Sequence, residues 1–277
     1  MNEFDLQLAD GSTLHCYDTG VGPDHTVFWH HGTPNTGPPP VPLFAASEQL
    51  GVRWVSYDRP GYGGSSPRPG RDVASAASYV DAVADELGID RFAVMGHSSG
   101  AAHALGCAAL LPQRVLGVAG IAALAPFDAD ALDWFAGMAQ SGVDTLRAAA
   151  AGRRVKEQHQ IDHGDDYDPE FTPADLAALG GSWSWLIEVV RAAGISGPGP
   201  AIDDDLANVS PWGFDPAAVA APVILLHGQR DRVAPPLHSQ WLADRCPDSE
   251  PRLYPEDGHI SVLTHAVDAL EWLTTRA

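Results

Sequence analysis

The chain has 277 residues, and 45% of them are hydrophobic, which is enough for a folded protein with a large buried core. Its 36 acidic residues against 16 basic ones give a formal net charge of −20. Because nucleic acids and anionic membrane surfaces are polyanions, this charge disfavours both as partners. The three cysteines, Cys16, Cys107 and Cys246, are widely spaced and form no C-x-x-C, so neither a disulfide framework nor a zinc knuckle is indicated.

The first residues, MNEFDLQLADG, are acidic and lack the basic and apolar regions of a signal peptide. The longest nearly apolar run, from Val115 to Phe127, is too short to span a bilayer. We therefore expect a cytoplasmic protein without a membrane partner. The sequence carries no indication of its oligomeric state.

Strand and helix patterns alternate along most of the chain. Alternating or continuous apolar runs predict strands at 4–8, 13–17, 26–29, 53–57, 92–95, 115–124, 222–228 and 252–255. Apolar residues at helical spacing predict helices at 43–50, 74–87, 101–111, 237–245 and 261–275. The first two strands form an antiparallel hairpin, and the later alternation implies an α/β fold with a mostly parallel sheet.

The pattern changes between residues 128 and 212, where helices are predicted at 129–140, 144–158, 173–179 and 182–193 without an intervening strand. We interpret 128–212 as a helical cap inserted into a core formed by 1–127 and 213–277. Four tryptophans of the cap are candidate substrate contacts, although packing within the cap explains most of them: Trp134, Trp183, Trp185 and Trp212. His159 and His163 stand four residues apart, but the Glu of H-E-x-x-H is missing, so no metal site is predicted.

The motif that organises the chain is Gly96-His97-Ser98-Ser99-Gly100, which fits G-x-S-x-G between a predicted strand and a predicted helix. In that context the motif is typical of a nucleophile elbow, a sharp turn that exposes a serine at the carboxyl end of a strand. Such a turn needs small neighbours, which Gly96 and Gly100 supply. The alternative is an ordinary Gly/Ser-rich turn.

A serine hydroxyl becomes a good nucleophile only beside a base that a third group orients. Asp231 and His259 each follow a predicted strand, so in a parallel sheet both lie at the same edge as Ser98. Taken alone, His259 reads as a surface histidine and Asp231 as a turn residue. Together they predict a triad, in which Asp128 is a conceivable substitute for the acid. Gly32 follows the predicted strand at 26–29 and permits a backbone turn there. The Thr33 N–H can then serve as an oxyanion donor.

Five motifs resemble those of the α/β-hydrolase fold superfamily, and together they span essentially the whole chain. They are the oxyanion motif His31-Gly32-Thr33-Pro34, the loop Asp58-Arg59-Pro60-Gly61-Tyr62-Gly63-Gly64-Ser65, the elbow, the acid loop His227-Gly228-Gln229-Arg230-Asp231, and Gly258-His259. The resemblance implies an eight-stranded, mostly parallel sheet with helices on both faces and a helical cap between the sixth and seventh strands. It also implies an oxyanion hole formed by the backbone N–H groups of Thr33 and Ser99.

This pattern predicts a cofactor-free serine hydrolase for a small or medium-sized carboxylic ester, lactone or amide. Ser98 is the expected nucleophile, His259 the base and Asp231 the acid. The runner-up among enzymes is a prolyl-aminopeptidase-like peptidase, although such members of the family tend to carry G-G-S-W-G at the elbow. Haloalkane dehalogenases use an aspartate where this chain has Ser98. Cofactor-free haloperoxidases or perhydrolases share the triad and stay open, as does a non-catalytic ligand-binding protein on the same fold.

Overall fold

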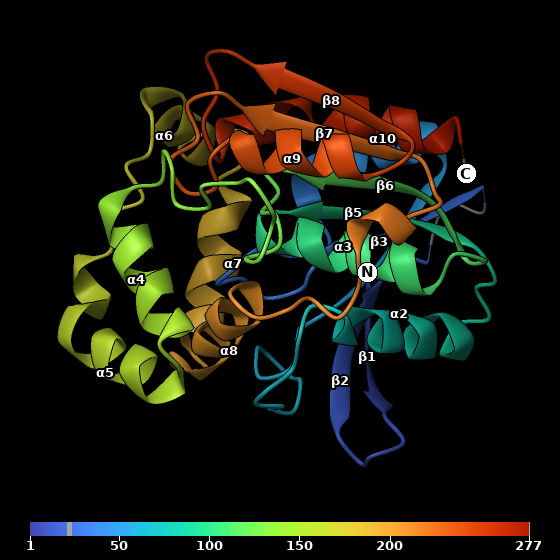
Figure 1. The fold of residues 1–277 in the computed structure, drawn as a ribbon. Helices are drawn as coiled ribbons and strands as arrows, with labels where there is room; N and C mark the ends of the chain where they lie inside the picture. The colour runs from blue at the N-terminus through green and yellow to red at the C-terminus, as the bar shows by residue number, and fades with distance from the viewer. Residues whose placement is uncertain (21–23, 277) are drawn as a thin grey trace.

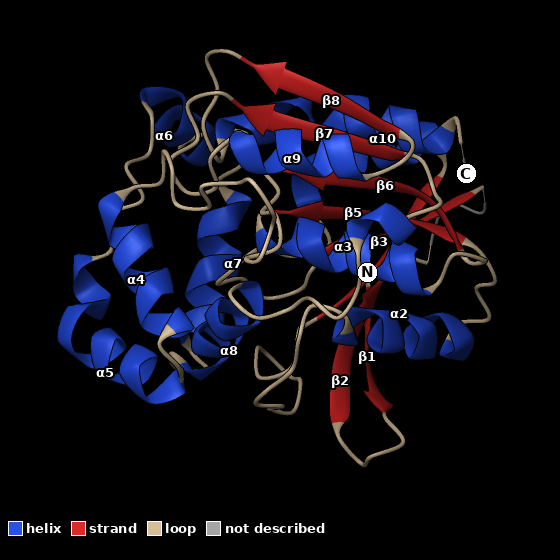
Figure 2. Ribbon diagram, in the orientation of Figure 1, coloured by secondary structure: helices blue, strands red, loops and turns tan. Residues whose placement is uncertain are grey.

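A single eight-stranded sheet forms the centre of the molecule (Figures 1 and 2). The computed structural model describes residues 1–20 and 24–276. The strand order is β1-β2-β4-β3-β5-β6-β7-β8, in which β1 and β2 are antiparallel to their neighbours and β3 to β8 pair in parallel. The strands are β1 (Asn2–Gln7), β2 (Thr13–Asp18), β3 (His25–His30), β4 (Val52–Tyr57), β5 (Phe92–His97), β6 (Val115–Ile121), β7 (Val223–Gly228) and β8 (Ser249–Tyr254). The predicted eight-stranded, mostly parallel sheet is confirmed.

Helices cover both faces of the sheet, which explains why its central strands are apolar on both sides. Alternate residues of one strand enter different clusters: Phe28 packs under α2 (Ser75–Glu86) and α3 (Ser99–Leu110), whereas Trp29 packs on the side of α10 (Ala266–Thr274). Helix α9 (Leu237–Arg245) lies on the α3 side and α1 (Phe44–Leu50) on the α10 side. The short 3₁₀ helices are η1 (Val41–Leu43), η2 (Gly164–Asp166), η3 (Pro216–Ala218) and η4 (Ser261–His265).

A helical segment, residues 128–212, connects β6 to β7. It contains α4 (Gln140–Ala150), α5 (Arg153–His163), α6 (Pro173–Leu179), α7 (Trp185–Gly194) and α8 (Gly199–Asn208), and no strand among its described residues. Figure 1 shows these helices on the side toward which the arrowheads of β5, β6, β7 and β8 point. The helical segment therefore lies beyond the carboxyl edge of the parallel strands.

Four features within or beside this segment differ from the sequence predictions. Residues 129–139 form turns instead of a helix, because Gly137 has a φ of 90°, which a right-handed helix does not accommodate. The single helix predicted at 144–158 is two helices that part at Gly152, where φ is 103°. Helix α8 was missed because its Gly-Pro start resembles a loop, although proline fits the first turn of a helix. Strand β6 ends at Ile121, short of the predicted 124.

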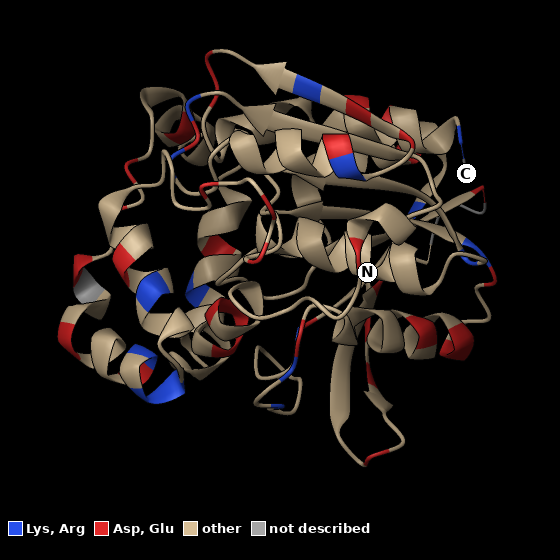
Figure 3. Cartoon of the chain, viewed as in Figure 1, with Lys and Arg blue, Asp and Glu red and all other residues tan. Residues whose placement is uncertain are grey.

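Acidic residues are spread over most of the chain in the view of Figure 3, without gathering in one stripe. No helix in the part of the chain that the structure describes is long and apolar enough to cross a bilayer. The three cysteines are free thiols, each of them buried. As expected from their spacing, they form no disulfide with one another.

Helix α3 approaches the sheet so closely that its second residue must be glycine. A Cβ added at Gly100 would overlap the backbone carbonyl oxygen of His30 on β3. A Cβ at Gly96 would overlap the carbonyl of Gly100 in the same way. These two contacts are the collisions that the small residues of G-x-S-x-G avoid, and they fix the distance between strand and helix.

We predict that Gly100→Ala lowers the free energy of unfolding by about 3 kcal/mol or more, because backbone atoms must move to admit one methyl group. Gly194→Ala is the matched control. Gly194 also lies in a helix, but a methyl group there meets no atom within 4 Å in the described part of the chain. This control should be neutral or stabilising by up to about 1 kcal/mol. Urea unfolding of both variants measures the difference, and equal stabilities would contradict the predicted overlap.

Candidate active site

Ser98 occupies the turn between β5 and α3 in a backbone conformation that non-glycine residues rarely adopt, with φ 57° and ψ −130°. Its N–H donates a 2.8 Å hydrogen bond to the carbonyl of Ile121 at the end of β6. The side chain is 9% exposed and stands at the N-terminus of a 12-residue helix, where the helix dipole favours negative charge. This is the strand-turn-helix geometry that the motif predicts.

His259 and Asp231 meet in the structure although 28 residues separate them. The Nδ1 atom of His259 lies 2.7 Å from Oδ2 of Asp231, and both side chains are buried. The backbone N–H groups of Val233 and Ala234 donate to Oδ1 of Asp231 at 2.8 and 2.9 Å. Because the carboxylate accepts, His259 carries its proton on Nδ1, which leaves Nε2 free to take up another proton.

Two further histidines support this pair, and the sequence analysis assigned neither a role. Nε2 of His227 lies 3.3 Å from Oδ2 of Asp231. Burial alone would raise the pKa of Asp231, but His259 and His227 outweigh it and hold that pKa below its ordinary value. Asp231 is therefore an anion at neutral pH. The only available signal for His227 was its position at the end of a strand, four residues before the predicted acid.

His97 links the elbow to the loop that carries the candidate base. Its Nε2–H donates to the backbone carbonyl of His259 at 3.0 Å, and the two imidazole rings lie 4.8 Å apart. Burial, and then the neighbouring His259, lower the pKa of His97 to about 3. A neutral His97 therefore places His259 beside the turn that holds Ser98.

The predicted oxyanion residues are also neighbours. The hydroxyls of Thr33 and Ser99 lie 2.8 Å apart, and an added Cβ on Gly32 would stand 3.4 Å from Cβ of Ser98. The N–H of Thr33 donates no hydrogen bond within the described residues. Ser99 is the first residue of α3, so its N–H has no partner inside the helix. Both N–H groups are thus available beside Ser98.

The four tryptophans are buried, with exposed fractions from 2% to 9%: Trp134, Trp183, Trp185 and Trp212. Each belongs to one of three apolar clusters, and the Trp134 indole N–H donates to the carbonyl of Ala125. Such burial is what packing requires, so their role as substrate contacts stays a prediction.

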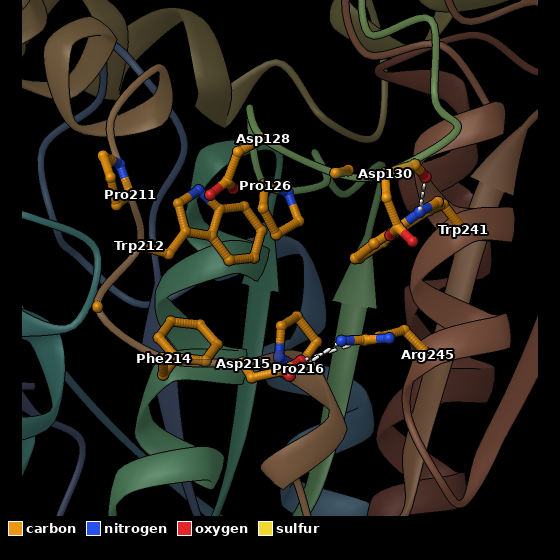
Figure 4. A pocket seen from close by; sticks show the side chains of 12 residues that line it. Pro126, Asp128, Asp130, Pro211, Trp212, Phe214, Asp215, Pro216, Trp241 and Arg245 are labelled. Carbon is orange, nitrogen blue, oxygen red and sulfur yellow. Dashed lines mark hydrogen bonds and ion pairs between the residues drawn. The ribbon is translucent and has the colours of Figure 1, made fainter.

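A surface cavity of about 380 Å³ lies apart from the candidate triad (Figure 4). Its lining includes Trp212, Trp241 and Arg245, and it contains none of Ser98, Asp231 and His259. The exposed Asp128, the conceivable substitute acid, lines this cavity several residues beyond the end of β6. The geometry therefore favours Asp231 as the partner of His259.

No group of three potential metal ligands occurs among the described residues. The rings of His159 and His163 lie 5.3 Å apart on α5. Nε2 of His159 lies 3.3 Å from the hydroxyl of Thr145, and Nδ1 of His163 lies 3.3 Å from a carboxylate oxygen of Asp166. Each histidine therefore has one polar protein partner, and the His163 side chain is exposed.

A residue that the sequence analysis missed is Asp175 on α6, which binds the loop that carries His259. Its Oδ1 accepts from the N–H groups of Ile260 and Ser261 at 2.8 and 2.7 Å. Its Oδ2 accepts from the N–H of Thr172, which completes a capping box. A Thr-x-x-Asp pattern indicates the cap, but no local pattern indicates the second contact, because 85 residues separate Asp175 from Ile260.

Burial alone would raise the pKa of Asp175, but N–H donors from Ser261, Thr172 and Ile260 outweigh it and lower that pKa. A carboxyl group whose pKa is lower in the folded state stabilises the fold above its unfolded pKa of about 4. That contribution is lost as the pH falls through the folded pKa.

We therefore predict that Asp175→Asn lowers the free energy of unfolding by about 1–3 kcal/mol at neutral pH. The gap to the wild type should begin to shrink as the pH falls below about 4, where Asp175 takes up a proton in the unfolded state, and should close as the pH falls through the lower folded pKa. Denaturant unfolding across this pH range measures it, with the exposed Asp133→Asn as the control. A gap that stays constant or widens at low pH would contradict this account.

Comparisons with known proteins agree with this geometry at the level of the family. A bifunctional esterase/perhydrolase of Acinetobacter calcoaceticus is 27% identical, and a non-heme chloroperoxidase of Streptomyces lividans is 28% identical, each over 83% of both chains. A hydrolase of 2-hydroxy-6-oxononadienedioate and 2-hydroxy-6-oxononatrienedioate from Cupriavidus pinatubonensis is 34% identical, but the match covers 40% of each chain.

A solved esterase from Thermogutta terrifontis has the same fold, with a TM-score of 0.72, 20% identity and 99% of both chains covered. A family model described as the alpha/beta hydrolase fold matches residues 25–266. That match covers most of the chain and includes Ser98, Asp231 and His259, so the chain belongs to the α/β-hydrolase fold family.

Proposed function

We propose that this hydrolase cleaves a small or medium-sized carboxylic ester, lactone or amide through Ser98, His259 and Asp231. One observation carries the proposal: the imidazole of His259, bonded at 2.7 Å to a buried carboxylate, lies 4.8 Å from the ring of His97, the residue before Ser98 in an elbow turn. A base oriented by an acid is what a serine hydroxyl needs to become a nucleophile. The helical segment 128–212 would form the cap over this site.

The reaction follows from the protonation states. Ser98 Oγ attacks the carbonyl carbon and passes its proton to Nε2 of His259, and Asp231 stabilises the resulting imidazolium. The carbonyl oxygen becomes an anion that the N–H groups of Thr33 and Ser99 bind. His259 then protonates the leaving alcohol or amine. Water attacks the acyl-enzyme with His259 as base, which releases the acid and restores Ser98.

Esters are the preferred substrate class within this proposal, because an esterase/perhydrolase and an esterase occur among the similar proteins. The first of these names also supports a second candidate reaction, in which hydrogen peroxide attacks the acyl-enzyme in place of water and a peracid is released. The elbow Gly-His-Ser-Ser-Gly departs from the aminopeptidase pattern, so peptidase activity ranks lower.

We predict that Ser98→Ala retains less than about a thousandth of the wild-type kcat on p-nitrophenyl esters, because the nucleophile is gone. The variant should keep the wild-type fold by circular dichroism and should no longer react with a fluorophosphonate probe. Ser210→Ala, whose hydroxyl bonds to the Leu206 carbonyl on α8, is the control and should keep its activity. A wild-type protein inert to the probe would instead favour a ligand-binding role.

The acid is tested by exchanging carboxylates for amides at two positions. Asp231→Asn should lower kcat by roughly 10⁴, because the amide no longer orients and stabilises the His259 imidazolium. Asp128→Asn should change kcat little, since Asp128 is exposed and lines the separate cavity. A large loss for Asp128→Asn with a small one for Asp231→Asn would reverse the assignment.

A further inference from the structure

The loop that carries Thr33 is held by a buried arginine, Arg59, which is 2% exposed. Its Nη1 donates to the carbonyl of His31, and its Nη2 donates to the carbonyl of Gly32 at 3.0 Å and to the hydroxyl of Thr33 at 3.1 Å. One guanidinium therefore binds three successive residues of the loop. Only a planar fork with several donors makes such a set of bonds.

The bond to Gly32 determines where the Thr33 N–H points. The Gly32 carbonyl and the Thr33 N–H belong to one peptide group, and in a trans peptide they point in opposite directions. Holding the carbonyl toward Arg59 thus turns the N–H away from Arg59. Because a Cβ added to Gly32 would stand only 3.4 Å from Cβ of Ser98, this peptide lies next to the candidate nucleophile.

His31 strengthens the same constraint. Its Nε2 accepts from the backbone N–H of Arg59 at 3.1 Å, so its proton is on Nδ1, which donates to the Gly32 carbonyl at 2.9 Å. Burial, and then the Arg59 charge, hold the pKa of His31 well below its usual range, so the imidazole ring stays neutral. The Gly32 carbonyl therefore receives two donors and has little freedom to rotate.

Arg59 is held in turn by Asp204, a fully buried carboxylate on α8 of the helical segment. Oδ1 of Asp204 accepts from Arg59 Nε at 3.1 Å, and its Oδ2 accepts from Arg59 Nη2 at 2.6 Å. Oδ2 also accepts from the hydroxyls of Thr33 at 2.5 Å and Tyr62 at 2.9 Å. Arg71 Nη2 lies 2.6 Å from Oδ1. The carboxylate thus joins the cap side of the molecule to the oxyanion loop.

Stability alone is a weak explanation for this cluster, because desolvation offsets much of the attraction in buried ion pairs. Burial alone would raise the pKa of Asp204, but Arg59 and Arg71 outweigh it and hold that pKa well below its usual range. The neighbouring acidic residues of α8 form ion pairs with other partners. Asp203 pairs with Arg153 and Asp205 with Lys156, both on α5 within the helical segment. Asp204 is the member of this triplet that reaches Arg59.

We propose that Arg59 and Asp204 are positioning residues for the oxyanion hole: Arg59 aims the Thr33 N–H at the developing oxyanion, and Asp204 completes that arrangement from the helical segment. The proposal rests on the serine-hydrolase function proposed above. It makes the helical segment part of the catalytic arrangement as well as a cover for the site.

The main test is Arg59→Lys, which keeps a cation beside Asp204 but loses the fork that binds both loop carbonyls. We expect kcat per active site, counted with a fluorophosphonate titrant, to fall by roughly 10²-fold with KM changed only a few-fold. Affinity for a boronic acid analogue of the tetrahedral intermediate should fall by a similar factor to kcat/KM. A role in folding alone would lower the melting temperature and leave kcat per titrated site unchanged.

Asp204→Asn keeps the shape of the side chain and provides a second test should Arg59→Lys fail to fold. Its kcat per site and its affinity for the boronic acid should fall together, by at least about tenfold. Asp203→Asn on the same helix is the matched control and should keep both values. Wild-type kcat per site in folded Arg59→Lys or Asp204→Asn, or a loss of kcat with unchanged boronic acid affinity, would overturn the proposal. Ser98→Ala, assayed in parallel, tests the proposed function itself. Full activity in Ser98→Ala would show that the proposed serine-hydrolase function is wrong, whereas an inactive Ser98→Ala leaves the Arg59 and Asp204 variants as a test of positioning alone.

Discussion

The close contact between α3 and the sheet is the constraint on which the candidate site depends. Ser98 stays in its strained conformation because its N–H is bonded to Ile121, and because Gly100 lets the helix reach the carbonyl of His30. The same contact brings the first N–H of α3 beside the Thr33 loop. The order of residue sizes in G-x-S-x-G is thus a packing requirement, and the position of Ser98 follows from it.

Buried carboxylates then connect the loops that this contact brings together. Asp231 receives two backbone N–H groups besides His259, Asp175 holds the backbone after His259, and Asp204 holds Arg59. A buried charge is tolerated only when donors surround it, so each of these side chains fixes several neighbours at once. Two of the three belong to the helical segment, although the triad candidates lie outside it. The helical segment therefore contributes to holding the candidate site, although Ser98, Asp231 and His259 lie outside it.

The sequence predicted the sheet well, and it indicated Ser98, Asp231 and His259 as a candidate triad, because both signals are local. Apolar runs indicated the eight strands, and Ser98, Asp231 and His259 each follow one of them. Part of the helical segment was predicted poorly, since a single positive-φ glycine such as Gly152 interrupts a helix that composition favours. The contact between Arg59 and Asp204 joins residues 145 positions apart, and no short pattern in either stretch indicates it. Long-range polar contacts of this kind depend on how the elements pack.

The Asp204 cluster has a consequence for how such proteins diversify. The carboxylate pairs with both Arg59 and Arg71, which are buried in the part of the chain that precedes the helical segment. If that segment were replaced by one from another family member, two buried cations would lose their carboxylate partner. The replacement segment would have to place an anion at the same position. Recombination between relatives, in evolution or in the laboratory, is thus restricted to donors with a matching acid. Grafting α8 together with both arginines is the smallest exchange that preserves the charge balance of this interface.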